Sequence, residues 1–191
     1  MSTMHKTFIE NKTITADFHF QQNQVFEECL FQQLSLQNQV FEHSDFVNTT
    51  FQNCDLSLAS FKNCKWQHVK FQNCKMLGIK QAEISPLLLE VSFEGCLLNM
   101  IQFEQLPLRK TSFNNCQIQE AIFLNCNLQE SIFDDCDLRD TLFQNCDLRK
   151  ADFRWAQHYI IHPMENNIKG AKFRSEGLHG LLQHLDIQIE H

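Results

Sequence analysis

Nine cysteines and nine histidines are the residues of this 191-residue chain that could do chemistry. Thiolates and imidazoles bind zinc, and paired thiols form disulfides, but both uses need characteristic spacings. No C-x-x-C pair occurs, and most cysteines are instead ten residues apart, at positions 54, 64 and 74 and again at 116, 126, 136 and 146. Cysteine also serves as a small buried apolar filler. The regular spacing favours that interpretation over a disulfide or a zinc site.

Other patterns typical of enzymes are missing from the sequence. His158 and His162 are four residues apart, but no helix is predicted around them and no third ligand is evident, so we expect no metal there. Glycine-rich phosphate loops, H-E-x-x-H and G-x-S-x-G do not occur. The carboxylates show no sign of a cleft that would desolvate them. We therefore expect a protein that is not an enzyme and that carries no cofactor.

A repeat of five residues organises the chain and explains the cysteine spacing. From Phe113 to Phe153 a large apolar residue occupies every fifth position, and a small residue lies two positions before each one. This period is neither that of a helix nor that of an ordinary strand. If the backbone turns after each unit, four units close a square coil, and coils stack at about 4.8 Å. Phe113, Phe133 and Phe153 then form one column, while Gln129 is expected to be exposed.

The units Cys136-Asp137-Leu138, Cys146-Asp147-Leu148 and Ala151-Asp152-Phe153 each read small residue, aspartate, large apolar residue. This pattern resembles the pentapeptide-repeat proteins, and the resemblance covers most of the chain. It implies an all-β fold, the right-handed quadrilateral β-helix, with a short C-terminal α-helix as a cap. The chain has only 5 Gly and 3 Pro, so we expect Asn and Asp to hold the corners, because both tolerate unusual backbone angles.

Breaks in the repeat divide the chain into five expected parts. These are an N-terminal cap over residues 1–20, coils over 21–80, a loop or bulge over 81–90, coils over 91–173, and a helix and strand over 174–191 that serve as a cap or a dimer contact. Within the first part, Ala16-Asp17-Phe18 reads as one repeat. Phe71 and Phe93 are twenty-two positions apart, so the insertion adds two, seven or twelve residues, depending on how many repeats are lost.

Two apolar stretches could contact another molecule. In the insertion, Pro86, Leu87 and Leu88 either pack locally or form a small contact patch. In the tail, one side of a short helix and a following strand are apolar, namely Leu178, Leu181, Leu182, Leu185, Ile187 and Ile189. This tail resembles the C-terminal cap of the antibiotic-resistance members of the family, which joins two subunits. We expect a homodimer through the C-terminus, with a cap that does not dimerise as the alternative.

The chain is acidic, with a formal net charge of −7, and the second half carries most of the excess. Residues 91–191 hold nine basic and fourteen acidic residues, whereas residues 1–90 hold seven and nine. The candidate partner-binding carboxylates lie in the most regular coils, and they are Glu120, Glu130, Asp134, Asp135, Asp137, Asp140 and Asp147. Such a surface repels nucleic acid and suits a protein that binds DNA phosphates, although it could also be a solvated face. Lysines at 62, 65, 70, 75 and 80 make the middle coils basic, which argues against a uniform DNA mimic.

The resemblance is closest to the quinolone-resistance and microcin-immunity branch of the family. It implies that the chain binds a bacterial type II topoisomerase, DNA gyrase or topoisomerase IV, as a partial DNA mimic and protects it from poisons. Some resistance members carry two long loops, whereas this chain has room for one. The alternatives are a structural or adaptor solenoid without a topoisomerase partner and, less favoured, a secreted carbohydrate-active β-helix. No membrane span and no signal peptide are evident, so we expect a cytoplasmic protein that does not bind membranes or nucleic acid directly.

Overall fold

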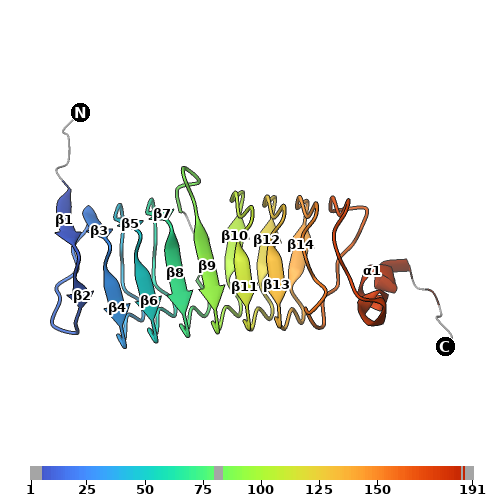
Figure 1. Ribbon diagram of the computed structural model, residues 1–191, viewed down its shortest axis with the longest axis horizontal. Coiled ribbons are helices and arrows are strands. Elements are labelled where there is room, and N and C mark those ends of the chain that lie inside the picture. Colours follow the sequence, from blue (N-terminus) through green and yellow to red (C-terminus); the bar gives the residue numbers. More distant parts are fainter. Residues whose placement is uncertain (1–5, 80–83, 186, 188–191) are drawn as a thin grey trace.

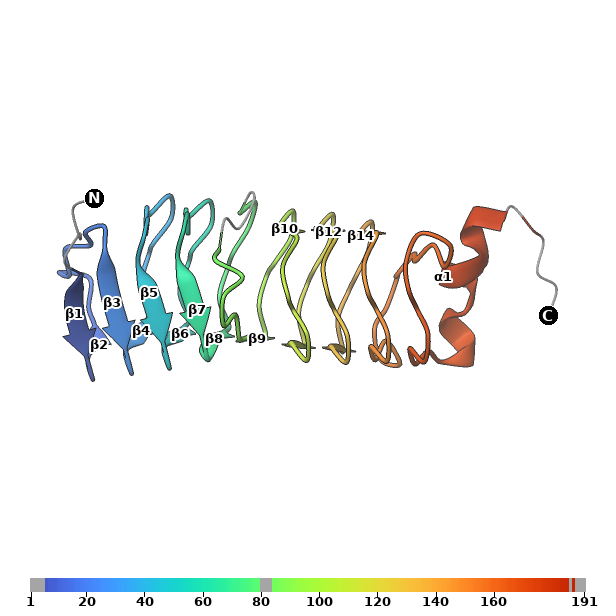
Figure 2. The same cartoon turned by 90° about the horizontal axis from the view of Figure 1, so that it is seen from above.

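The computed structural model describes residues 6–79, 84–185 and 187, which form one elongated rod (Figure 1). The chain winds in successive coils from the N-terminal to the C-terminal end, and the view from above shows each coil beside the next (Figure 2). Every strand pairing is parallel, as expected when each coil repeats the path of the one before. None of the helices in this part of the chain is long and apolar enough to cross a bilayer.

Three sheets run along the rod, and each strand is two to four residues long. A four-stranded sheet contains β1 (Thr7–Glu10), β3 (Gln24–Glu27), β5 (Asp45–Val47) and β7 (Lys65–Gln67). A seven-stranded sheet contains β2 (Thr13–Ile14), β4 (Leu30–Gln32), β6 (Thr50–Gln52), β8 (Val69–Gln72), β9 (Val91–Glu94), β11 (Ser112–Asn114) and β13 (Ile132–Asp134). A three-stranded sheet contains β10 (Gln102–Glu104), β12 (Ile122–Leu124) and β14 (Leu142–Gln144).

The rod has four faces, which we number in the order in which the chain visits them. Face 1 carries β1, β3, β5 and β7, face 2 the seven-stranded sheet, and face 4 the three-stranded sheet. Face 3 is held by single parallel bridges, which run from Ser35 through Asp55, Lys75, Leu97, Gln117 and Asp137 to Gln157. The all-β, right-handed quadrilateral β-helix predicted from the sequence is confirmed.

Stacked aromatic rings fill the interior behind face 2. The column begins at Phe31 and Phe51, whose ring centroids are 4.3 Å apart, and continues without a gap to Phe153 and Phe173, 5.4 Å apart. Phe133 lies 4.8 Å from Phe113 and 4.7 Å from Phe153, and both ring pairs are nearly parallel. This is the predicted column, and it shows that the repeat places one ring of every coil at the same point behind face 2.

The cysteines are the predicted small filler. All nine thiols are free and buried. Several donate to the carbonyl oxygen of the residue 23 positions earlier, as Cys136 does to Phe113 at 3.4 Å and Cys146 to Phe123 at 3.2 Å. Burial raises the pKa of the Cys64 thiol to about 12, so this thiol stays protonated at neutral pH. A buried protonated thiol is chemically inert, which agrees with a packing role.

Most corners of the coil place one residue in the left-handed backbone region. Asn and Asp hold many of these corners, for example Asn115, Asn125 and Asp135, whose φ angles are 50°, 53° and 50°. Larger residues hold others, among them Leu58 at 59° and Met100 at 60°. Asn and Asp adopt this conformation at lower cost than branched or long side chains. The expectation that Asn and Asp make the turns is therefore right for many corners only.

The first coil of the rod begins earlier in the sequence than the repeat pattern suggests. Ile9 and Ile14 are the inward residues of the first coil, because they are in register with Phe26 and Phe31. Ala16-Asp17-Phe18 is therefore not a repeat of the ladder. Phe18 and Phe20 instead pack against Phe26, with ring centroids 5.8 and 6.2 Å away, and so close this end of the rod.

The insertion adds two residues and leaves the core column intact. The Ser85 amide donates to the Cys64 carbonyl, a separation of 21 residues that matches the regular bond from Lys65 to Ser44. Six residues later Val91 pairs with Val69, 22 positions earlier, whereas paired residues of the regular coils are 20 positions apart. The extra residues thus lie between Ser85 and Val91, in a loop that rises above the neighbouring turns before β9 (Figure 1).

Candidate functional site

The candidate partner-binding carboxylates lie around two adjacent coils, which we call the acidic belt (residues 120–147). The belt holds seven Asp and Glu and a single basic residue, Arg139. Strand β13 positions Asp134 on face 2, and Asp135 follows it at the next corner. Glu120 and Asp140 follow each other at the corner between faces 3 and 4. The helical winding places these side chains outward because the apolar member of each unit points inward. The belt is therefore a ring of carboxylates on a rigid core.

Three of the seven carboxylates are neutralised within the rod. Glu130 accepts from the Arg109 Nη2 at 2.7 Å, and Asp147 accepts from the Arg149 Nη2 at 2.6 Å. Asp137 lies 2.8 Å from the His158 Nδ1 and accepts from the Gln119 Nε2 at 2.6 Å. Sequence reasoning did not anticipate these pairs. The signal was present, because an Asp side chain that accepts from the amide two residues later brings the arginine beside it in Asp137-Leu138-Arg139 and Asp147-Leu148-Arg149.

The other four carboxylates are open to a partner. Glu120, Asp134, Asp135 and Asp140 are all exposed. Within the described part of the chain, none of them forms an ion pair. A charge without an internal partner can bind an external cation without first breaking a bond, so these four carboxylates are the ones available for pairing with a cation of another molecule.

Gln129 is not the exposed residue that the sequence suggested. It is half-buried, and its Nε2 donates to the Asp147 Oδ2 at 2.7 Å. The repeat pattern shows that the position is polar, but the partner comes from the next coil. Gln129 therefore helps to hold the Asp147 carboxylate, and replacing it would remove that hydrogen bond.

Asp147 makes the stability of the rod sensitive to pH. The hydrogen bond from Arg149 lowers the pKa of this carboxyl below its ordinary value of 3.8. A depressed pKa stabilises the fold above the ordinary value, and that contribution is lost as the pH falls through the lower pKa of the folded state. We expect Asp147→Asn to lower the free energy of unfolding by about 0.5–1 kcal/mol at pH 7 and by much less at pH 2.

Urea unfolding at both pH values measures this difference. Asp134→Asn is the matched control, because it removes an exposed carboxylate without an ion pair in the described structure, and it should change stability equally little at both pH values. A loss for Asp147→Asn that is as large at pH 2 as at pH 7 would show that the pair with Arg149 does not stabilise the rod.

The loop residues divide into a packed and an exposed part. Leu89 packs against the core, whereas Leu87 and Leu88 have 60% and 68% of their surface exposed, and Pro86 is exposed as well. Leu89 therefore agrees with local packing, whereas Leu87 and Leu88 agree with a contact patch. The exposed pair is small and lies two faces before the edge that carries Glu120 and Asp140.

The C-terminal segment folds as three short helical pieces against the last coil. They are η1 (Ser175–Gly177), α1 (His179–Leu182) and η2 (Gln183–Leu185). Gly180 makes the closest approach, since its carbonyl accepts from the Ile161 amide at 3.0 Å and a Cβ there would lie 2.1 Å from the Tyr159 carbonyl oxygen. Leu181 is buried, and Leu182 is half-buried.

The remaining apolar tail residues are open. Leu178, Leu185 and Ile187 keep 44%, 51% and 53% of their surface exposed. Ile189, and with it the expected strand, lies outside the described residues. The cap thus buries one leucine, Leu181, and leaves three apolar side chains exposed in the single chain.

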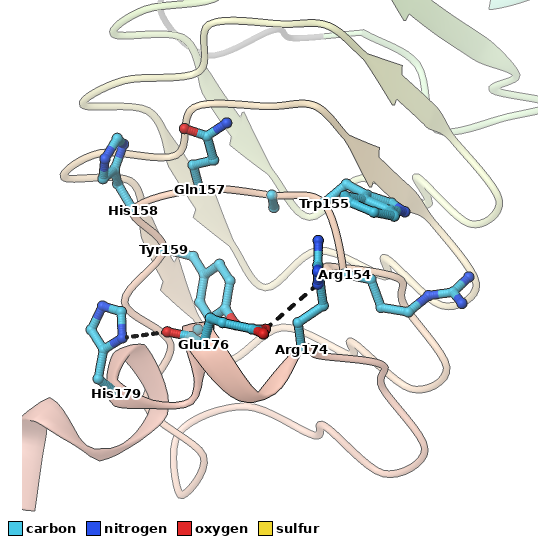
Figure 3. Close-up of a pocket in the computed structure, with 10 residues that line it drawn as sticks. Arg154, Trp155, Gln157, His158, Tyr159, Arg174, Glu176 and His179 are labelled. Carbon is cyan, nitrogen blue, oxygen red and sulfur yellow. Dashed lines mark hydrogen bonds and ion pairs between the residues drawn. The ribbon is translucent and has the colours of Figure 1, made fainter. Parts of the chain in front are cut away.

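A hollow of about 470 Å³ lies where this segment meets the coils, lined among others by Arg154, Trp155, Tyr159, Arg174 and Glu176 (Figure 3). Arg174 lies 4.3 Å over the Trp155 ring, and its Nε is 3.5 Å from the Glu176 Oε2. Arg154 is bound by Asp152 outside the hollow at 2.8 Å. The arginines of the hollow are therefore already paired, and we assign it no ligand.

The histidines considered as metal ligands do not converge. His158 contacts Asp137, whereas His162 lies beside His184, with ring centroids 4.0 Å apart. Within residues 6–79, 84–185 and 187, no three His, Cys, Asp or Glu side chains are grouped so that they could hold a metal ion. His158 and His162 thus contact different partners.

Comparisons with known proteins agree with the architecture. A family model described as a pentapeptide repeat region matches residues 24–99 and 87–175. Two trypsin-treated variants of QnrB1, a plasmid-mediated fluoroquinolone resistance protein, superimpose with a TM-score of 0.51 at 16% identity, over 97% of this chain and 98% of theirs. HetL, a pentapeptide repeat protein of the cyanobacterium Nostoc involved in heterocyst differentiation regulation, gives a TM-score of 0.33 at 14% identity, over 78% of this chain and 85% of its own. No curated protein sequence matched the chain.

Proposed function

The chain belongs to the pentapeptide-repeat family, and from this premise we propose that it is a non-enzymatic rod that binds a bacterial type II topoisomerase, DNA gyrase or topoisomerase IV. The acidic belt would contact the basic surface on which the enzyme holds DNA. Binding there would protect the enzyme from poisons such as quinolones. The observation that carries the proposal is the set of four exposed, unpaired carboxylates on a rigid scaffold, Glu120, Asp134, Asp135 and Asp140.

The physical argument is one of complementary charge on a preorganised surface. A protein that binds DNA presents Lys and Arg at positions set by the phosphates. Carboxylates fixed on stacked coils can meet such cations without paying the entropy of ordering a flexible chain. The fold of the chain is that of a fluoroquinolone resistance protein, and the repeat sequence resembles the branch to which such proteins belong. Both agree with a topoisomerase as the partner.

The mimicry of DNA would be partial. The coils that follow the belt are basic, because residues 149–174 hold six Lys and Arg against two Asp and Glu. The belt itself covers about two coils, roughly 10 Å along the rod. We therefore propose that the belt supplies one acidic contact, and that the exposed loop residues Pro86, Leu87 and Leu88 supply a second, apolar one.

We also propose that two chains join through their C-terminal ends. Leu178, Leu185 and Ile187 are the residues that support this, because they remain exposed after the cap has buried Leu181. A second copy of the same end would cover them in a two-fold arrangement. Dimerisation would double the length of the rod and present two acidic belts to a two-fold symmetric enzyme.

A structural or adaptor solenoid is the second candidate, since one fold serves many functions. The alternation of an acidic belt with basic coils favours it, because such a rod could join partners of opposite charge. A supercoiling assay with purified gyrase separates the two candidates. The first predicts inhibition that rises with protein concentration, and relief of ciprofloxacin poisoning at lower doses. If both effects were absent at micromolar protein, the adaptor solenoid would be the favoured candidate.

A further inference from the structure

One edge of the rod carries apolar side chains where the other edges are mostly polar. This edge separates face 3 from face 4, and its corner residues follow one another from coil to coil as Asn38, Leu58, Gly78, Met100, Glu120 and Asp140. The backbone shows that they share one edge, because Leu58 donates to the Leu77 carbonyl, Gly78 to Asn99, and Met100 to Gln119. Along this line the surface changes from apolar to acidic.

The apolar part is costly to the free protein. Leu58 and Met100 have φ angles of 59° and 60°, which large L side chains adopt only with strain. They nevertheless expose 58% and 49% of their surface, so burial does not repay that strain. The Leu58 Cδ2 lies 3.1 Å from the point where a Cβ on Gly78 would be, so the leucine extends over the position without a side chain. Leu77 and Leu97 on face 3 are half-buried beside it and widen the patch.

The acidic part lies on the next two coils. Glu120 and Asp140 are exposed, and neither has an ion pair within the described residues. Coils are about 4.8 Å apart, so the edge offers roughly one side chain per 4.8 Å. An α-helix offers one side chain on a given side every turn, about 5.4 Å. Over the four steps between the five coils from Leu58 to Asp140, the two spacings drift apart by only about 2–3 Å, which long side chains can span.

We propose that this edge binds an amphipathic α-helix of a protein partner. Three turns of that helix would place aliphatic side chains against Leu58, over Gly78 and against Met100, and the next two turns would place Lys or Arg against Glu120 and Asp140. The charge of the edge excludes an acidic helix, and its apolar end distinguishes the site from a purely electrostatic surface. The inference rests on the proposed function in one respect, because Glu120 and Asp140 belong to the acidic belt.

A synthetic helical peptide tests the proposal. The probe has about eighteen residues, or five turns, with leucine on its first three turns and lysine on the following two turns of the same side. A scrambled peptide of identical composition serves as the reference. Binding to the full chain is measured by fluorescence anisotropy. We expect Leu58→Asn combined with Met100→Asn to weaken binding by about tenfold or more. Asn suits the backbone at both corners, so the melting temperature should not fall.

Leu88→Asn is the matched control, because Leu88 is also an exposed leucine with a φ of 58° but lies in the loop before β9. It should leave binding of the peptide unchanged, although it removes one of the loop residues proposed to contact the topoisomerase. Glu120→Gln with Asp140→Asn should weaken binding and reduce its dependence on salt. Equal binding of the scrambled peptide, no binding of the designed one, or an equal loss in Leu88→Asn would each overturn the proposal.

A supercoiling assay on the same samples separates this inference from the proposed function. If the chain inhibits gyrase but the peptide does not bind, the proposed helix site on the edge is wrong and the topoisomerase remains the partner. If the peptide binds at the edge but gyrase is unaffected, the helix site stands and the partner is another protein.

Discussion

Replacing Phe133 by alanine is expected to lower the free energy of unfolding by about 3–5 kcal/mol. The ring is fully buried between Phe113 and Phe153, at centroid distances of 4.8 and 4.7 Å, and it also meets Phe123 and Phe143 edge-on. Alanine would leave a cavity between two coils, and the coils cannot collapse into it because their spacing is fixed by backbone hydrogen bonds on every face. The change therefore combines lost burial with an unfilled cavity.

Urea unfolding followed by far-ultraviolet circular dichroism measures this effect. Gln144→Ala is the matched control, since Gln144 is exposed on β14 and its side chain has no hydrogen bond within the described structure. We expect that control to change stability by no more than about 0.5 kcal/mol. Similar, mild effects of both substitutions would mean that the column of rings does not stabilise the fold.

Neutralising the four open carboxylates is expected to weaken topoisomerase binding by roughly thirtyfold. The variant combines Glu120→Gln, Asp134→Asn, Asp135→Asn and Asp140→Asn. At about 0.5 kcal/mol for each exposed ion pair, the four together contribute about 2 kcal/mol. None of the four forms an ion pair in the described structure, so the melting temperature should stay unchanged. The inhibitory concentration in a supercoiling assay reports the effect.

Asp137 does not belong in that variant, although the sequence grouped it with its neighbours. Its carboxylate contacts His158 and Gln119, so Asp137→Asn would confuse lost binding with lost stability. The matched control removes four exposed carboxylates outside the acidic belt, at Glu10, Asp17, Glu28 and Glu165. If that control lost as much activity, net charge would explain the effect and the belt would have no special role.

The repeat was sufficient to predict the fold because one physical requirement recurs in every unit. A large and a small side chain must share the interior of each quarter coil, so Phe113, Phe133 and Phe153 could be placed in one column before any coordinates. The same rule failed at the ends. Ala16-Asp17-Phe18 has the composition of a repeat, but Ile9 and Ile14 already occupy the inward positions of that coil.

The candidate site was less predictable, because the function of a surface residue depends on the coil above and below it. Asp134 and Asp147 both lie in the regular coils, yet one is open and the other is held by Arg149 and Gln129. The sequence allowed an insertion of two, seven or twelve residues. The bond of Ser85 to Cys64 and the pairing of Val91 with Val69 fix its length at two residues. Leu58 and Met100 stood out only once their backbone angles and exposure were known.

Competition between the rod and DNA for gyrase tests the proposed function most directly. Purified gyrase is bound to a labelled DNA duplex, and the chain is added at increasing concentration while the bound fraction is measured. The account predicts that the chain displaces the DNA, and that the variant lacking the four open carboxylates needs roughly thirtyfold more protein to do so. A stable complex of gyrase with both DNA and the rod, or no displacement at any concentration, would contradict it.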